Sequence, residues 1–359
     1  MTASKKGGLI SVPAASLCIA PSYVSSFVCP EQSCPLVPAA SDGARLPRCL
    51  ALRDLHIGGI YERSLRLACP AACAHVLFQT GAFHFQTTTL PASHLHAANR
   101  EIPLLSEPLP EISYLLDLQR TCMKLLATQR YPLDVRLILL GIYLEDAVDF
   151  IEQGQGYELG KIIKSYDSPM FEARFHEALR NISFEPLQHL NFLWGIVKDI
   201  AADPHSPLAR EDVSRAARAF HLGSTPDLQH IARAFPVCRR SLESYVTIPF
   251  PQLLEHFLLH QWFTELYPCA VRGGLIHNYW VFVIAAKVYE LLLTGLAAIE
   301  RQILTGHQIA GLTSRAARLP QSPACLAAIE KALAPHEEDS LWMFNTLFHV
   351  QEHASGTSA

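Results

Sequence analysis

Residues 111–129 read EISYLLDLQRTCMKLLATQ, and this stretch decides the fold class. Its apolar residues recur at steps of three and four, which places them on one face of an α-helix. Residues 135–151 are so apolar that we expect a helix covered on most sides. Similar patterns continue along the chain at 170–179, 186–202, 206–220, 225–234, 251–267, 275–304, 324–333 and 340–350. The sequence therefore predicts a mainly α protein with a multi-helix globular body.

The chain changes character near residue 100. The first hundred residues are rich in Pro, Ser, Cys and Ala, with little helical periodicity and two β-like stretches at 76–78 and 83–89. We expect an irregular, Cys-containing N-terminal lobe beside the helices. The predicted parts are an irregular leader over 1–20, the cysteine-bearing lobe over 21–100, a helical domain over 105–351 and a disordered tail over 352–359.

The composition excludes several classes of protein. Of the 359 residues, 50% are hydrophobic and 17% are charged, so the chain is neither disordered nor fibrous. The formal net charge of −4 gives no general attraction to a polyphosphate, and we expect no nucleic-acid partner.

Two apolar stretches raise the question of export or a membrane. The first, over residues 9–18, follows Lys5 and Lys6 but is broken by Pro13, so a secretory signal is the minority interpretation. The second, over 275–299, carries charged Lys287 and Glu290, and we predict a buried helix with no membrane span. We therefore expect a cytoplasmic protein with reduced thiols.

The ten cysteines are unevenly placed. Four are scattered singly over helical patterns and are expected to pack as small apolar side chains. The other six lie in the first 73 residues: Cys18, Cys29, Cys34, Cys49, Cys69 and Cys73. Cys49 has arginines close by, and Cys69 precedes a proline that is typical of a helix start; both features favour a thiolate. The residues alone leave zinc, an iron–sulfur cluster or unligated buried thiols open.

Other motifs are weaker. The glycines of residues 154–160 follow no strand, so we interpret them as a plain turn. His256 and His260 are four residues apart beside Glu255, but they do not form a metalloprotease motif, and we expect exposed or capped histidines. Glu145 and Asp146 are expected at a solvated helix edge.

Several segments resemble, in order, the flagellin lysine-N-methylase family of bacteria. The segment PSYVSSFVCPEQSC at 21–34 resembles the family's opening, with its C-x4-C pair. The segment LRLACPAACAHVL at 65–77 is similar to its Cys-Pro helix start, and RYPLDVRLILLGIYLE at 130–145 is similar to its Tyr-Pro-Leu block. Residues 254–268 and 279–296 fit mainly in pattern.

The resemblance implies an S-adenosylmethionine-dependent protein-lysine N-methyltransferase whose partner is flagellin. It also implies a 4Fe-4S cluster held by Cys29, Cys34 and Cys69, with Cys49 as a looser match to the fourth cysteine. Neither the catalytic nor the cofactor-binding residues are identified. A lysine amine must lose its proton before it attacks a methyl sulfonium, and Tyr143 or Glu145 are candidates for the base.

The sequence departs from the family where paired cysteines are replaced by Pro38 and Ala39. A further cysteine block of the family is missing. The alternative function is therefore a degenerate, non-catalytic helical protein that binds flagellin or another partner and has a zinc-bound or metal-free N-terminal lobe.

Overall fold

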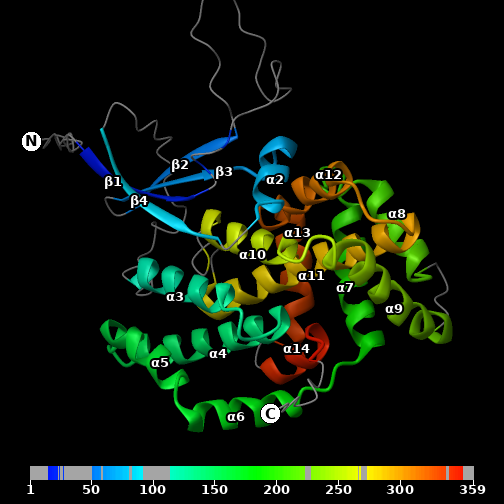
Figure 1. The fold of residues 1–359 in the computed structure, drawn as a ribbon. Helices are drawn as coiled ribbons and strands as arrows, with labels where there is room; N and C mark the ends of the chain where they lie inside the picture. The colour runs from blue at the N-terminus through cyan, green and yellow to red at the C-terminus, as the bar shows by residue number, and fades with distance from the viewer. Residues whose placement is uncertain are drawn as a thin grey trace, which may run out of the picture. The chain divides into compact units, whose positions relative to one another are not determined.

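The computed structural model describes residues 15–22, 24, 27, 51–57, 60–80, 83–91, 114–222, 228–265, 267, 273–336 and 339–350 (Figure 1). The chain divides into two compact units. The first comprises residues 1–66 and 83–102, and the second comprises 67–82 and 103–359. The division thus differs from the predicted boundaries, since residues 67–82 belong to the helical unit. They do so because this segment folds as helix α2 and packs against two other helices of that unit.

The first unit contains a four-stranded sheet with the order β2-β3-β1-β4. Strands β2 and β3 pair antiparallel, β1 and β3 pair in parallel, and β1 and β4 pair antiparallel. The strands are β1 (Ala15–Pro21), β2 (Leu52–Ile57), β3 (Ile60–Leu65) and β4 (Phe85–Pro91). This sheet is more regular than the irregular lobe that we expected.

The strand predictions are partly confirmed. The stretch 83–89 is confirmed by β4. The β-strand predicted at 76–78 is wrong, because residues 76 and 77 belong to helix α2. This helix starts at Pro70, as the Cys-Pro pair predicted. Strand β1 lies, except for its last residue, within the stretch 1–20 that was expected to be an irregular leader. Strands β2 and β3 were not predicted, although Gly58 and Gly59 between them are a pair typical of tight hairpins.

The second unit is built of helices, which confirms the mainly α fold class. Its helices are α2 (Pro70–Leu77), α3 (Leu115–Ala127), α4 (Leu133–Glu152), α5 (Leu159–Tyr166), α6 (Pro169–Arg180), α7 (Pro186–Ala202), α8 (Arg210–Ala219), α9 (Leu228–Leu242), α10 (Leu253–Thr264), α11 (Gly274–Glu300), α12 (Gly306–Ala316), α13 (Pro323–Leu333) and α14 (Ser340–Leu347). Short turns of 3-10 helix lie at η4 (Gly156–Glu158), η6 (Leu319–Gln321) and η7 (Ala334–His336), and a π-helical turn at η5 (Glu243–Thr247).

Local sequence explains where several of these helices begin. The hydroxyl of Ser168 accepts a hydrogen bond from the backbone N–H of Phe171 at 3.2 Å, and Pro169 occupies the first turn of α6. Helix α12, which the apolar pattern did not predict, starts with a capping box between Thr305 and Gln308. Helix α5 was also missed; it begins directly after the turn predicted around Gly156.

Helix α11 forms the core of the helical unit. It packs against α4, α7, α8, α9 and α12 (Figure 1). An 18-residue window of α11 is apolar enough to cross a membrane by length and composition, and 78% of that window is buried within the structure. This burial is what we predicted for residues 275–299.

Candidate functional site

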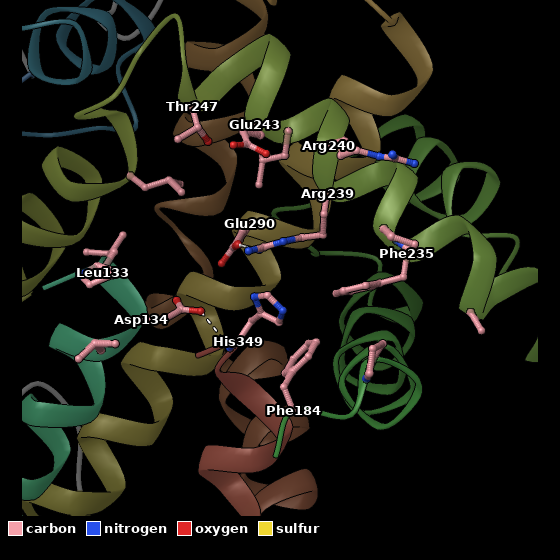
Figure 2. A pocket seen from close by; sticks show the side chains of 17 residues that line it. Leu133, Asp134, Phe184, Phe235, Arg239, Arg240, Glu243, Thr247, Glu290 and His349 are labelled. Carbon is pink, nitrogen blue, oxygen red and sulfur yellow. Dashed lines mark hydrogen bonds and ion pairs between the residues drawn. The ribbon is translucent and has the colours of Figure 1, made fainter. Parts of the chain in front are cut away.

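A pocket of about 690 Å³ lies within the helical unit (Figure 2). Its wall is formed by the first turn of α4, the start of α7, most of α9, the π-helical turn η5, single residues of α10 and α11, and His349 beyond α14. A pocket of this volume is within the range of small-molecule sites. The segments that line it are far apart in the sequence, so only the tertiary fold creates it.

Two irregularities of the backbone shape one wall of this pocket. Pro236 lies inside α9 and has no N–H to donate, so the helix lacks one internal hydrogen bond to Ala232. The π-helical turn η5 follows α9 directly. Ala232, Pro236, Glu243 and Thr247 all line the pocket. Local departures from α-helix of this kind are frequent at functional sites.

A network of four charged side chains lies at the pocket, and three of them, Asp134, Arg239 and Glu290, line it. Nζ of Lys287, whose side chain is only 5% exposed, donates to Oδ1 of Asp134 at 2.7 Å and to Oε2 of Glu290 at 2.8 Å. Arg239 donates to Oε1 of Glu290 at 2.5 Å, and Figure 2 shows the two side chains pointing toward each other. The backbone N–H of His349 donates to Oδ2 of Asp134 at 3.1 Å. Two cations thus balance two carboxylates.

The electrostatics of this network keep Glu290, Lys287 and Arg239 ionised. Burial alone would raise the pKa of Glu290, but Lys287 and Arg239 outweigh it and lower this pKa to about 2. Burial alone would lower the pKa of Lys287, yet Asp134 and Glu290 raise it above the usual value. Lys287 therefore stays an ammonium at neutral pH and does not act as a base or a nucleophile.

Aromatic rings form the opposite wall. The ring of Phe184 lies 5.6 Å from that of Phe235 and 5.1 Å from the imidazole of His349, measured between centroids. His189 lies behind them, where its Nδ1–H donates to the carbonyl of Thr346 at 2.9 Å. Burial and the nearby Lys287 lower the pKa of His189 to about 4, so its ring is neutral.

His349 contributes a polar group that faces this pocket. Burial lowers the pKa of His349, with a further contribution from Arg239, so the ring is neutral at pH 7. Within the part of the chain that the structure describes, Nδ1 of this ring is buried and has no hydrogen-bond partner. Buried polar atoms are nearly always hydrogen-bonded, so this nitrogen is available to a group that enters the pocket.

The predicted metal ligands are only partly within the described residues. Cys29, Cys34 and Cys49 lie outside them. Cys69 is buried at the N-cap of α2, four residues before buried Cys73. Burial raises the pKa of Cys73 well above its usual value, which keeps that thiol protonated. The described ranges contain no group of three or more His, Cys, Asp or Glu residues that could hold a metal ion. The four-cysteine site therefore stays a prediction.

The expected exposure of the two histidines of α10 is wrong. His256 and His260 are not exposed; each is only 1% exposed. They are buried because α10 packs against α2 and α3, so that all its sides are covered. The neighbouring Glu255 forms a buried ion pair with Arg136 at 2.8 Å and accepts two hydrogen bonds from Gln129.

The two candidate bases do not line the pocket either. Tyr143 is fully buried on α4, and burial raises its pKa, so its hydroxyl stays protonated at neutral pH. Glu145 accepts a hydrogen bond from Ser340 at 2.8 Å and Asp146 accepts one from Tyr166 at 2.6 Å, so both serve contacts between helices.

The residues of this charged network were not predicted as site candidates. A signal for them existed in the sequence. Lys287 and Glu290 are spaced three residues apart on a helix that is otherwise apolar, and a buried charge requires a partner. Their partners Asp134 and Arg239 lie on other helices, and no local pattern connects them.

Comparison with known proteins gives the family. The sequence model of the FliB lysine N-methylase C-terminal domain matches residues 119–341. This range begins in α3, ends in α14 and includes every residue that lines the pocket except His349. No curated protein and no solved structure matches the chain at a significant level. Since the match covers more than half of the chain, the protein belongs to the FliB lysine N-methylase family.

Proposed function

We propose that this chain transfers methyl groups from S-adenosylmethionine to lysine side chains of flagellin. The observation that carries the proposal is the family match over residues 119–341, which contains the pocket described above. The free thiols of the helical unit, such as Cys69, Cys122 and Cys325, suit a reducing compartment, and we propose the cytoplasm as the place of the reaction.

The residues of the pocket suit this cofactor by their chemistry. Arg240 offers a guanidinium for a carboxylate, and Glu243 offers a carboxylate for an ammonium group or a ribose hydroxyl. Phe184 and Phe235 offer aromatic faces to an adenine ring or a sulfonium cation. When bound, the cofactor supplies a methyl group activated by the positive charge on sulfur.

The protein has to make the lysine amine neutral. The pKa of a free lysine is near 10.4, and burial or a nearby positive charge lowers it. Entry into the pocket takes the amine partly out of water, which favours its neutral form. The neutral ring of His349 is placed to accept the released proton at Nδ1 and to pass it to water. The nitrogen–carbon bond then forms as the carbon–sulfur bond breaks.

The proposal also keeps the iron–sulfur cluster predicted from Cys29, Cys34, Cys49 and Cys69. What supports it is the resemblance of the N-terminal segments to the family. The proton transfer and the bond formation described above use only side chains of the helical unit.

The test is a methylation assay with the full chain, purified flagellin and S-adenosylmethionine, read by mass spectrometry of lysine-containing peptides. We expect methyl-lysine with the unaltered chain. Glu243→Gln and His349→Gln should each lower the rate at least about tenfold, because each removes one group that contacts substrate or cofactor.

The matched control is Lys331→Gln, which changes a charge on α13 outside the pocket and should leave the rate unchanged. A folded chain that binds flagellin but yields no methyl-lysine under anaerobic reconstitution would establish the non-catalytic alternative. Equal rates for both pocket variants and the control would remove this pocket from the reaction.

A further inference from the structure

A second pocket, of about 520 Å³, lies on the other face of α9. Helix α9 turns by about 100° per residue. On that geometry Ala232, Pro236 and Arg239 share the face of the first pocket, whereas Arg233 and Val237 share the opposite face. None of the described residues lines both pockets. Helix α9 is therefore a wall common to two separate cavities.

The second pocket is strongly basic. Its lining includes the side chains of Arg218 at the end of α8, Arg233 on α9 and Arg301 after α11. The imidazoles of His221 and His230 also line it, with 6.0 Å between their ring centroids. Among the described residues that line it there is no Asp or Glu. Three guanidinium groups and two imidazoles thus surround one cavity with no carboxylate in the described part of its wall.

The charges of these three arginines have no counter-charge in the described structure. No ion pair joins Arg218, Arg233 or Arg301 to an acidic side chain within the ranges that the structure describes. Some other arginines of the same helices are paired, such as Arg215 with Glu211 and Arg239 with Glu290. Like charges that are gathered without a counter-charge repel one another, and an anion relieves that repulsion.

The dipoles of the neighbouring helices do not explain why all three arginines are at this pocket. Cations are favourable near helix C-termini, which suits Arg218 and Arg301. Arg233 lies in the second turn of α9, where the dipole of that helix does not stabilise a cation. The helix ends therefore give no reason for a cation at this third position.

Unusual backbone conformations also occur at the second pocket. In the part of the chain covered by the structure, two residues other than glycine have a positive φ: His221 at 57° and Arg301 at 52°. Both line this pocket. The left-handed position after a helix is usually taken by glycine or asparagine, because other side chains cost free energy there. At these two positions the strained backbone carries a basic side chain instead, and residues held in this way cluster at ligand sites.

The rest of the lining is mainly apolar and small. Ala219, Ala234, Ala298, Ile299 and Val237 form most of it, together with Tyr245 of the π-helical turn. This surface suits the organic part of a small molecule rather than a bare inorganic ion.

We propose that this second pocket binds a small organic anion with two or more phosphate groups, held by Arg218, Arg233 and Arg301. Guanidinium groups bind phosphate oxygens in pairs, and the cavity has the volume of a small-molecule site. The proposal does not depend on methyl transfer, because none of the described residues of this site lines the first pocket.

The test is isothermal titration calorimetry of the full chain with ADP, with inorganic pyrophosphate and with citrate, at low and high salt. We expect ADP to bind most tightly, pyrophosphate more weakly and citrate least, with affinity falling as salt rises. In the double variant Arg233→Gln/Arg301→Gln, ADP affinity should fall at least about tenfold, since each hydrogen bond to a charged group is worth that much.

Two control variants show whether the anion binds in this pocket or elsewhere on the protein. Arg174→Gln/Arg180→Gln removes the same charge from the exposed surface of α6 and should leave ADP affinity unchanged. Arg240→Gln changes the first pocket only and should also leave it unchanged. Loss of ADP binding in Arg240→Gln, with normal binding in Arg233→Gln/Arg301→Gln, would place the anion in the first pocket and overturn the proposal. Equal losses in both double variants, or no binding by any probe to the folded chain, would also overturn it.

Discussion

The charged side chains at the first pocket stabilise one another through ion pairs. Lys287, Glu290, Asp134 and Arg239 are each costly to bury alone, and each is paired. Glu290 is the centre of this arrangement, because one of its oxygens accepts from Lys287 and the other from Arg239. Removal of its charge would leave two cations facing a single carboxylate.

Glu290→Gln should therefore destabilise the protein at pH 7. We expect a loss of about 3 kcal/mol, at the lower end for a buried ion pair because the side chain of Glu290 is still 18% exposed. The measurement is the free energy of unfolding from urea titrations. Lys331→Gln is the control, since its pair with Asp199 is exposed and such pairs contribute little.

The pH dependence of the same variant has a defined sign. The pKa of Glu290 is about 2 in the folded protein and 4.5 in an unperturbed glutamate, so the unfolded state binds the proton more readily. The stability that Glu290 contributes is therefore complete above pH 4.5 and is lost as the pH falls toward 2. The difference between the unaltered chain and Glu290→Gln should shrink over that range. A difference that stays constant down to pH 2 would contradict the assignment.

At the scale of helices, the packing of α8 on α11 depends on a glycine, Gly295, which has no side chain. A Cβ atom added at Gly295 of α11 would lie 2.6 Å from Cα of Ala216 and 3.0 Å from its Cβ. Ala216 is fully buried on α8. The two helices can lie this close only because Gly295 has no side chain.

Gly295→Ala should destabilise the helical unit. Overpacking costs about 1–3 kcal/mol, which exceeds the roughly 1 kcal/mol that alanine gains over glycine inside a helix. Gly311→Ala on α12 is the matched control. Its nearest neighbour would be the flexible end of Arg315 at 3.7 Å, so stability should rise slightly. Thermal unfolding of both variants decides this, and a higher melting temperature for Gly295→Ala would show that the helices can move apart freely.

The helices themselves were largely predictable from the sequence. Segment 186–202 coincides with α7, and 340–350 differs from α14 only at its end. Helix formation depends on residues three and four apart and on caps, which a local pattern contains. Helices α5 and α12 were missed.

For the whole molecule, the predicted cluster takes its cysteines, Cys29, Cys34, Cys49 and Cys69, from separate segments of the sequence. A cluster that needs all four would make activity depend on the complete chain.

Cys29→Ala and Cys69→Ala should each abolish flagellin methylation, whereas Cys238→Ala should leave it intact. Cys238 is buried on α9, where its thiol donates to the carbonyl of Ala219 at 3.3 Å, so it is a packing residue. Because Cys69→Ala could also disturb α2, iron content and visible absorbance after anaerobic reconstitution are measured beside activity. Full activity and no bound iron in all three variants and in the unaltered chain would exclude the cluster.

The sequence alone determined the mainly α fold, most helix positions and, through motifs such as RYPLDVRLILLGIYLE, the family. These features are local, because periodicity, capping residues and short motifs each depend on residues that are close together in the sequence. Only the tertiary structure revealed the pockets. Lys287 meets Asp134 across 153 residues of sequence, and His349 meets the same carboxylate across 215. A pair of charges at such separation has no local pattern, because the free energy that brings them together comes from the packing of apolar helices around α11 rather than from the charges themselves.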